Sequence, residues 1–311
     1  MATITKTVKA SGGDYTSLSA WESAEQTNLV TDGDVHVVEC DDFQQTAALV
    51  IDGWTTGVSN FITVKPAAGQ EHSGIRGTGP RIVASSLAFQ VNESYTVIEG
   101  FSVSTSGSDQ SGFFVDGSVP QFILFDRCIA YDCTGNGFLI GEADTTMRNC
   151  VAVGCTADGL VVYYGYKGGT ILCENMVAIA NGGMGFDEFA NTLAVKNCYA
   201  GGNTGVDFDS GLTMTTCHAE DGTGDTTTAY STSSGAYFTN VTAGSEDVHI
   251  ASASSALIGA ATDLSGDFTL DFDRETRSAW DVGADEYIAA GGGSLPAIRP
   301  YTSRMAHLLT R

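Results

Sequence analysis

Four acidic side chains in the middle of the chain have the type and spacing to do chemistry. They are Asp187, Glu188, Asp207 and Asp209. A recurring pattern places four apolar residues at one equivalent position: Phe138, Leu160, Phe186 and Val206. On that alignment Asp187 and Asp207 lie side by side on neighbouring repeats. Two carboxylates about 5 Å apart can act as nucleophile and general acid on a glycosidic bond, and a wider pair suits inversion. Crowding also raises the pKa of one of them, as a general acid requires.

Other side chains near this quartet widen the choice of chemistry. Three tyrosines one repeat earlier could form a platform for sugar rings: Tyr163, Tyr164 and Tyr166. The sharpest hypothesis is therefore a glycosidase-like groove. The same carboxylates could instead hold Ca²⁺, whose ligands are carboxylate and carbonyl oxygens, or could be solvated surface in an acidic protein. No other cofactor is expected, and the five histidines are too scattered to suggest a Ser-His-Asp arrangement.

Eight cysteines could suggest disulfides or zinc, but their positions favour packing. Six of them recur at two equivalent positions of the repeat: Cys128, Cys150, Cys198 and Cys217 at one, and Cys133 and Cys155 at the other. Small buried thiols behave as compact hydrophobes. Because the chain contains no CxxC pair and no Cys/His cluster, no zinc site is predicted. We expect the thiols to stay reduced and to stack in the interior.

The elements that must position these side chains are short strands in a tandem repeat. The repeat is clearest between residues 126 and 209, where its length drifts between roughly 19 and 26 residues, close to the range of solenoids. Short alternating runs are separated by glycine and asparagine corners. Neighbouring repeats align instead of mirroring each other, which favours parallel coils stacked about 4.8 Å apart. Asn149, Asn175 and Asn197 are expected to stack as an amide ladder at one corner.

The N-terminal residues differ from the repeats. Within residues 15–26, three apolar residues recur at every third position: Leu18, Trp21 and Ala24. This spacing predicts a short amphipathic helix, with Thr16 or Ser17 as its N-cap. Because a solenoid must cover its first coil, we expect this helix to be the N-terminal cap.

The last residues form a basic tail on an acidic chain. Residues 288–294 are a flexible Gly-rich linker by composition, and residues 295–311 contain three arginines and no acid. The side chains expected to dock on a partner are Arg299, Tyr301, Arg304, Met305, Leu308, Leu309 and Arg311. The alternative is an ordinary disordered terminus. Three segments are thus expected: residues 1–30 for a strand and cap helix, 31–287 for the coils, and 288–311 for the linker and docking tail.

Composition and charge bound the class of protein. The chain has 311 residues, 42% of them hydrophobic, and a mean hydropathy of +0.03, which is typical of a soluble globular protein. It carries 14 Lys and Arg against 37 Asp and Glu, a net charge of −23. Such a charge argues against binding to nucleic acid or to an anionic membrane. The first residues show no secretory signal, so synthesis in a cytoplasm is expected.

The repeats, the stacked ladders and the segment 266–287 together resemble the pectate-lyase-like superfamily of parallel β-helices. Within that segment, an Asp/Arg-rich turn precedes the run Asp-Val-Gly-Ala-Asp-Glu-Tyr at 281–287, which is similar to the closing segment of many β-helix proteins. The resemblance covers roughly residues 30–290. It implies an all-β fold: a single-stranded right-handed parallel β-helix solenoid with a short N-terminal capping helix and an extended C-terminal tail. It also implies a homo-oligomer, with a trimer as the expected state.

The superfamily includes polysaccharide lyases, glycoside hydrolases, and bacteriophage tailspikes and other phage surface proteins. Its lyases generally use a Lys or Arg base on anionic polymers. The candidates Arg127, Arg148 and Lys196 share one corner position, where we expect them to be solvated, and the negative chain would repel such a polymer. A lyase is therefore the poorer hypothesis.

Two classes of function remain. The first is a structural or adhesive surface protein without enzyme activity, such as a capsid decoration protein or short spike of a bacteriophage virion. It would attach through its tail to other virion or surface proteins, with glycans as further partners, and would reach the virion or cell surface after cytoplasmic synthesis. The alternative is a carbohydrate-active enzyme, a glycoside hydrolase or polysaccharide lyase, that uses the acidic quartet in a β-helix groove.

Overall fold

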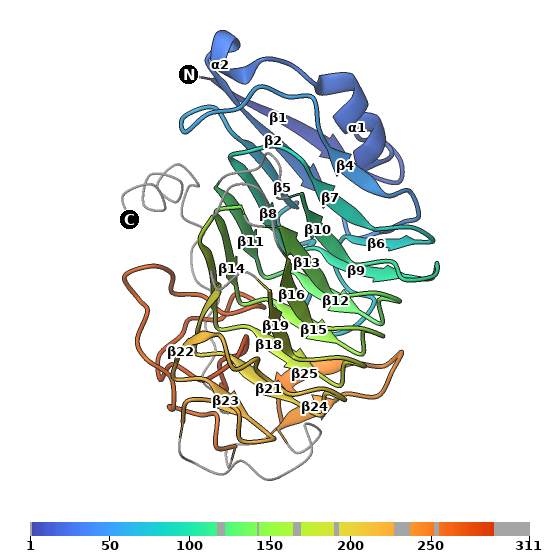
Figure 1. Cartoon of the computed structure of the whole chain (residues 1–311). Coiled ribbons are helices and arrows are strands. Elements are labelled where there is room, and N and C mark those ends of the chain that lie inside the picture. Colours follow the sequence, from blue (N-terminus) through green and yellow to red (C-terminus); the bar gives the residue numbers. More distant parts are fainter. Residues whose placement is uncertain are drawn as a thin grey trace.

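The structure, a computed structural model, is a right-handed parallel β-helix built from three sheets (Figure 1). It describes residues 2–116, 122–141, 143–163, 169–189, 193–226, 237–251 and 255–288. A typical coil adds one short strand to each sheet, and each strand of the three sheets pairs in parallel with the strands of neighbouring coils. The predicted right-handed parallel β-helix is thereby confirmed, whereas the predicted extended C-terminal tail lies outside the described residues. Neither helix in the described ranges is long and apolar enough to span a membrane.

The described strands fall into sheets A, B and C, which have nine, eight and six strands. Sheet A contains β1 (Ala2–Val8), β2 (Asp34–Cys40), β5 (Ile62–Pro66), β8 (Thr96–Glu99), β11 (Ile123–Asp126), β14 (Thr145–Arg148), β17 (Ile171–Glu174), β20 (Leu193–Lys196) and β22 (Thr213–Thr215). Sheet B contains β3 (Gln44–Gln45), β6 (Arg81–Ala84), β9 (Ser102–Thr105), β12 (Ile129–Tyr131), β15 (Val151–Val153), β18 (Val177–Ile179), β21 (Tyr199–Gly201) and β23 (His218–Ala219). Sheet C contains β4 (Leu49–Ile51), β7 (Phe89–Val91), β10 (Phe113–Val115), β13 (Phe138–Gly141), β16 (Leu160–Tyr163) and β19 (Phe186–Glu188).

In-register pairing turns the repeat into continuous columns of buried side chains. One such column in sheet C consists of Phe89, Phe113, Phe138, Leu160 and Phe186, all fully buried. The rings of Phe113 and Phe138 stack with their centroids 4.8 Å apart. Because side chains alternate along a strand, the residue that follows each member of the column points outward.

The cysteines also occupy the interior. All eight are buried and free, which confirms the prediction of packing without disulfides. Burial and the neighbouring thiol of Cys128 hold the pKa of Cys150 well above its ordinary value. Such thiols are poor nucleophiles, since the thiolate is the reactive form.

The corner between sheets A and B contains the predicted asparagines. Asn149, Asn175 and Asn197 have φ angles of 50, 52 and 53°, in the left-handed region that asparagine tolerates better than most residues. The amide ladder is only partly present: the Asn197 amide donates to Asn175 Oδ1 at 3.1 Å. Asn149 and Asn175 instead donate to the carbonyls of Leu270 and Asp281, each at 2.9 Å. The prediction of a self-stacked ladder was therefore incomplete, because a distant segment supplies closer acceptors.

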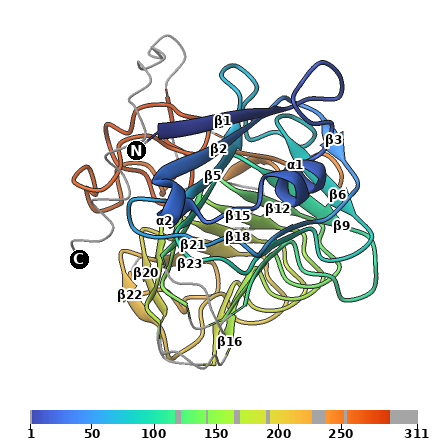
Figure 2. The same ribbon diagram turned by 90° about the horizontal axis from the view of Figure 1, so that it is seen from above.

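Two short helices lie at the N-terminal end of the coils, α1 (Leu18–Glu25) and α2 (Leu29–Asp32) (Figure 2). Ser17 is the N-cap of α1 and accepts a hydrogen bond from the Ala20 amide, as one of the two predicted caps. Leu18 and Trp21 are buried and belong to the interior core. Apolar side chains of α1 thus shield the first coil from water.

The parallel coils end at β23, and the remaining described chain folds back over sheet B. Residues 237–251 form the antiparallel pair β24 (Phe238–Asn240) and β25 (Asp247–Ile250), and residues 255–288 continue without long strands. The outer face of sheet B carries Ile129, Tyr131, Val151, Val153, Val177, Ile179 and Tyr199. These side chains pack against Phe238, Val248, Ile250, Leu257, Phe272 and Val282 of the returning chain. We call residues 255–288 the closing segment.

The aromatic column gives a direct test of the register. Phe138→Ala would leave a cavity between Phe113 and Leu160, and we expect it to lower the free energy of unfolding by about 3–5 kcal/mol. Leu139→Ala is the matched control, because Leu139 points outward and is only half-buried; it should cost clearly less. Equal losses in urea denaturation would contradict the assignment of inward and outward positions.

Candidate functional site

The register of sheet C decides which predicted acidic residues face one another. Phe186 forms a parallel bridge with Phe208, and their rings stack with centroids 4.8 Å apart. Val206 is 40% exposed. The alignment made from the sequence is therefore wrong by two residues at this coil, because stacking Phe208 buries more apolar surface than stacking Val206 would. Asp187 consequently neighbours Asp209, and not Asp207, on the next coil.

Glu188 and Asp207 serve the backbone. Glu188 follows the outward Asp187 and aligns with buried apolar residues of the preceding coils. Its Oε1 accepts a hydrogen bond from the Leu193 amide at 2.6 Å. Asp207 is 2% exposed, and its Oδ2 accepts two backbone amides of the turn at 220–221, at 2.9 and 3.1 Å. Burial raises the pKa of Asp207 in spite of these bonds. Both carboxylates thus fix turns, and the structure separates them from the outer face.

Asp187 and Asp209 form an acidic end on the outer face of sheet C. Burial raises the pKa of Asp187, and the charge of Asp158 and then that of Asp209 add to this rise. Asp158 lies one coil earlier, where its Oδ1 accepts the Met184 amide at 2.7 Å. Because neighbouring coils are about 4.8 Å apart, Asp187 and Asp209 can present their carboxylates to one bound molecule.

The same outer face is apolar and aromatic on the preceding coils. Its central column comprises Val50, Gln90, Phe114, Leu139, Val161 and Asp187. The rings of Phe114 and Tyr163 stack almost in parallel, with centroids 6.2 Å apart and an interplanar angle of 9°. Of the three predicted sugar-binding tyrosines, Tyr163 therefore lies on this face. Tyr164 and Tyr166 lie outside the described residues, as do the docking residues predicted in the tail.

A second polar centre, not predicted from the sequence, holds the closing segment to the corner asparagines. The side chain of Arg277 is fully buried and donates to Asn149 Oδ1 at 2.7 Å and to the Ala284 carbonyl at 2.7 Å. Glu286 Oε2 lies 3.8 Å from its guanidinium. Arg277 thus closes a turn of its own segment and ties that turn to a coil 128 residues away. The Asp/Arg-rich composition of this turn was the signal in the sequence.

Next to Arg277, three carboxylates of the closing segment converge. Asp271, Asp273 and Asp285 place oxygens within 4.8 Å of one another. Burial, and then the charge of Asp273, raise the pKa of Asp271 well above its ordinary value. Burial likewise raises the pKa of Asp285 to about 6. Each carboxylate already has a hydrogen-bond partner. Asp271 accepts from the amides of Glu275 and Glu286. Asp285 accepts from the amide of Ile250, and Asp273 is bonded to His249.

His249 supplies positive charge to this cluster. Its Nδ1 lies 2.6 Å from Asp247 Oδ1, and its Nε2 lies 3.3 Å from Asp273 Oδ2. Burial opposes protonation, but the hydrogen bonds and charges of Asp273, Asp285 and Asp247 outweigh it and raise the pKa of His249 to about 9. Together with Arg277, the imidazolium offsets part of the negative charge of these carboxylates. The arrangement is therefore suited to fastening the closing segment.

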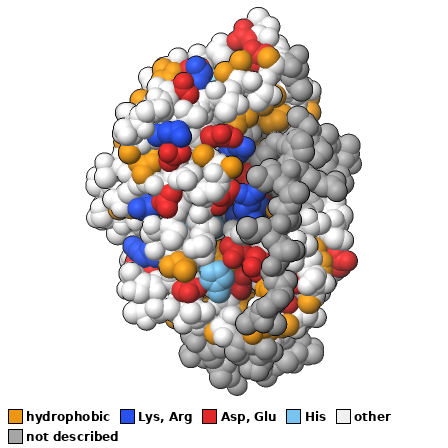
Figure 3. Space-filling view, turned by 180° about the vertical axis from the view of Figure 1, so that it is seen from behind, with side chains coloured by type: hydrophobic (Ala, Val, Ile, Leu, Met, Phe, Trp, Pro, Cys, Tyr) orange, Lys and Arg blue, Asp and Glu red, His pale blue; other side chains and the backbone are white. Residues whose placement is uncertain are grey.

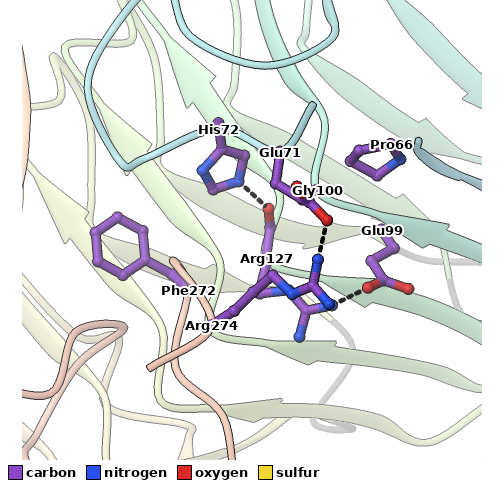
Figure 4. A pocket seen from close by; sticks show the side chains of 8 residues that line it. All are labelled: Pro66, Glu71, His72, Glu99, Gly100, Arg127, Phe272 and Arg274. Atoms are coloured by element: carbon purple, nitrogen blue, oxygen red, sulfur yellow. Dashed lines mark hydrogen bonds and ion pairs between the residues drawn. The ribbon is translucent and has the colours of Figure 1, made fainter. Parts of the chain in front are cut away.

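A shallow pocket lies where the closing segment meets the corner of sheets A and B (Figure 4). Arg127 pairs with Glu99 and Arg274 with Glu71, so that each guanidinium in the pocket already has a carboxylate partner. His72 contacts the Arg127 carbonyl at 2.7 Å, and burial lowers the pKa of His72 to about 4. Arg127 was expected to be solvated but is 3% exposed, because the closing segment covers this corner.

Acidic and basic side chains also alternate on the surface. On the face in Figure 3, Lys and Arg lie beside Asp and Glu, and a histidine adjoins an acidic group. At the end of the sheet A strands, Glu174 lies between Arg148 at 3.2 Å and Lys196 at 3.7 Å. Both cations thus take part in ion pairs between coils.

The His249 centre predicts a pH dependence of stability. Because the folded-state pKa of about 9 lies above the ordinary value of 6.5, this group stabilises the fold fully below pH 6.5 and loses its effect as pH rises through 9. We expect the free energy of unfolding to fall over that window, by about 3 kcal/mol at most. Thermal denaturation between pH 6 and 10 measures this loss. His249→Gln should flatten the profile, and an unchanged slope in that variant would contradict the assignment.

Comparison with known proteins assigns no family or function to this chain. No protein-family model matches the sequence, and no curated protein matches it significantly. Among solved structures, the chain is similar to one titled "Crystal structure of pectate lyase Pel9A", with 14% identity over 92% of this chain and 96% of that one. The TM-score of 0.31 is too low to transfer any property of that protein. What the strand pairing itself establishes is that this chain folds as a right-handed parallel β-helix.

Proposed function

We propose that the chain is a rigid structural and adhesive protein of a surface assembly, such as a capsid decoration protein or short spike of a bacteriophage virion. One observation carries this proposal: the coil register breaks up the acidic quartet. Glu188 and Asp207 are committed to backbone amides. What is left on the outer face of sheet C is a surface of apolar and aromatic side chains, which is suited to binding.

The remaining surface fits adhesion to a glycan. Phe114 and Tyr163 offer flat rings two coils apart, and Gln90 lies one coil before Phe114 with an amide that can hydrogen-bond to hydroxyl groups. Val50, at the far end of the column, is 39% exposed. Aromatic side chains combine a large apolar area with a specific geometry, which favours recognition of a ring. Because the coils repeat every 4.8 Å or so, the face can also follow an extended polymer.

Anchoring in the assembly is assigned to the C-terminal tail. Its three arginines would be attracted to acidic partners, and Met305, Leu308 and Leu309 could supply apolar contacts. This assignment follows from the composition of residues 295–311, which lie outside the described ranges.

A second candidate function is hydrolysis of a glycan by Asp187 and Asp209. The raised pKa of Asp187 favours it, because a general acid must keep its proton near neutral pH. Asp209 on the next coil would then act as the nucleophile, and the short spacing between coils is that of a retaining pair.

Charge reversal tests the anchoring role. In the triple variant Arg299→Glu, Arg304→Glu and Arg311→Glu, we expect the protein to stop co-sedimenting with the particle that carries the unchanged protein. Lys9→Glu, which also reverses a charge but lies near the N-terminus, is the control and should leave co-sedimentation intact. Undiminished association of the triple variant would rule out anchoring by the tail.

Substitution of the acidic pair tests hydrolysis. If the second candidate is right, purified protein releases reducing ends from a surface glycan, and Asp187→Asn or Asp209→Asn lowers this rate by a factor of 10³ or so. Asp158→Asn should retain activity but shift its alkaline limb to lower pH, because Asp158 helps to raise the pKa of Asp187. No release from a broad panel of glycans would leave only the binding function.

A further inference from the structure

Positive charge is distributed unevenly over the three sheets. Every Lys and Arg in the described ranges forms an ion pair with an Asp or Glu. These pairs lie on or next to sheets A and B, or in the closing segment. Among the described residues, therefore, no Lys or Arg offsets the negative charges on sheet C.

Asp187, in the last strand of sheet C, is the acid for which this matters most. It is only 7% exposed. Within the described ranges, neither a cation nor a side-chain hydrogen-bond donor contacts its carboxylate. Acidic side chains are rarely so buried unless they are paired, because a buried charge without a partner costs free energy. Asp187 thus marks a place where the fold itself leaves negative charge without compensation.

Carboxylates on the two adjoining coils extend this negative region. Asp158 accepts the Met184 amide at 2.7 Å, and Asp209 accepts the Ser210 hydroxyl at 3.3 Å. Neither of them forms an ion pair with a described residue. Both charges help to raise the pKa of Asp187, after its burial, which shows that the carboxylates repel one another. A cation bound between them would relieve this repulsion.

Aromatic rings on the same face lead towards the carboxylates. Phe114 and Tyr163 stack across two coils, and the next coil carries Phe189, which is 50% exposed. The Phe189 amide donates to the Val162 carbonyl, so Phe189 continues β19 beside Tyr163. Because side chains alternate along a strand, Phe189 lies on the same side as Asp187, two residues before it. An exposed ring and an uncompensated carboxylate are therefore neighbours on this face.

The combination of rings and carboxylates discriminates among possible ligands. An anionic polymer would be repelled by the three carboxylates. A bare Ca²⁺ ion takes six to eight oxygen ligands and would leave the rings unused. A sugar that carries an ammonium group uses both features. Its apolar face can pack on an aromatic ring, and its ammonium group can donate charge-assisted hydrogen bonds to a carboxylate.

We propose that the outer face of sheet C binds a polymer of amino sugars whose amino groups are free, and that Asp187 receives one of the ammonium groups. This inference rests on the proposed adhesion to a glycan and names the chemical class of that glycan. Phe114, Tyr163 and Phe189 hold the sugar rings, and the carboxylates select for positive charge. Since the coils repeat, successive sugars of the polymer can contact successive coils.

Two oligomers that differ only at the nitrogen test this selection. In titration calorimetry of the full-length protein in slightly acidic buffer, a glucosamine hexamer should bind about tenfold more tightly than its fully N-acetylated form, because only the free amine forms the charge-assisted hydrogen bond. Salt should narrow the difference, since it screens the charges. In Asp187→Asn the ratio of the two affinities should fall to about one. Asp263→Asn removes an equal charge from the exposed surface of the closing segment and should keep the ratio.

The remaining outcomes separate the amino-sugar assignment from adhesion itself. Equal affinity of the unchanged chain for the two hexamers, or tighter binding of a galacturonate hexamer, would overturn the assignment and leave glycan adhesion standing. So would an oligolysine that binds as tightly as the glucosamine hexamer, because the face would then recognise charge without a sugar. A ratio that persists in Asp187→Asn would contradict the role of this residue.

Phe189→Ala tests the aromatic half of the face. It should weaken the binding of both hexamers by a similar factor and leave their ratio unchanged, because the ring contacts the sugar and not its amino group. Unchanged affinity for both hexamers would contradict the aromatic platform. If the unchanged chain binds no glycan hexamer at all, adhesion to a glycan is refuted, and the inference with it.

Discussion

The backbone hydrogen bonds between successive coils are the interaction on which the rest of this structure depends. Each strand of sheets A, B and C pairs in parallel with the next coil, so the spacing of about 4.8 Å fixes which side chains meet. That spacing stacks Phe113 on Phe138 and brings Cys128 next to Cys150 in the interior. Since a shift by one residue would turn every side chain to the opposite face, packing and register enforce each other.

Because the interior side chains must stack in this way, it is on the outer faces that side chains can differ from coil to coil. Sheet B is covered by the closing segment, which is fastened by buried Arg277 and by the asparagines of the corner. A buried guanidinium is stable only where acceptors surround it, and here backbone carbonyls and Glu286 do so. Beside it, the hydrogen bonds and charges of Asp273, Asp285 and Asp247 raise the pKa of His249 to about 9. The closing segment covers sheet B, whereas the outer face of sheet C is open in part, from Val50 at 39% exposure to Asp187 at 7%.

The proposed binding role rests on how the acidic residues are used. Glu188 and Asp207 were candidates for catalysis, but each satisfies backbone amides at a turn, where its charge has a structural use. Asp187, which is only 7% exposed, and Asp209 remain on the outer face of sheet C and could serve chemistry or simply border a glycan. The aromatic pair Phe114 and Tyr163 gives the same face an apolar half. Adhesion requires only these surfaces, whereas hydrolysis also requires that the two aspartates converge on one bond.

The sequence by itself determined the coils: the recurring Phe, Cys and Asn positions predicted parallel strands, an apolar interior and asparagine corners, because these depend on neighbouring repeats alone. It did not determine the partners of residues far apart in the chain. Arg277 meets Asn149 across 128 residues, and no local pattern contains that contact. The register at Phe208 was also decided by tertiary structure, because turns of variable length let either Phe208 or Val206 match the repeat. The stacking of the Phe208 ring on Phe186 fixed this register. The register in turn decided which two aspartates are neighbours.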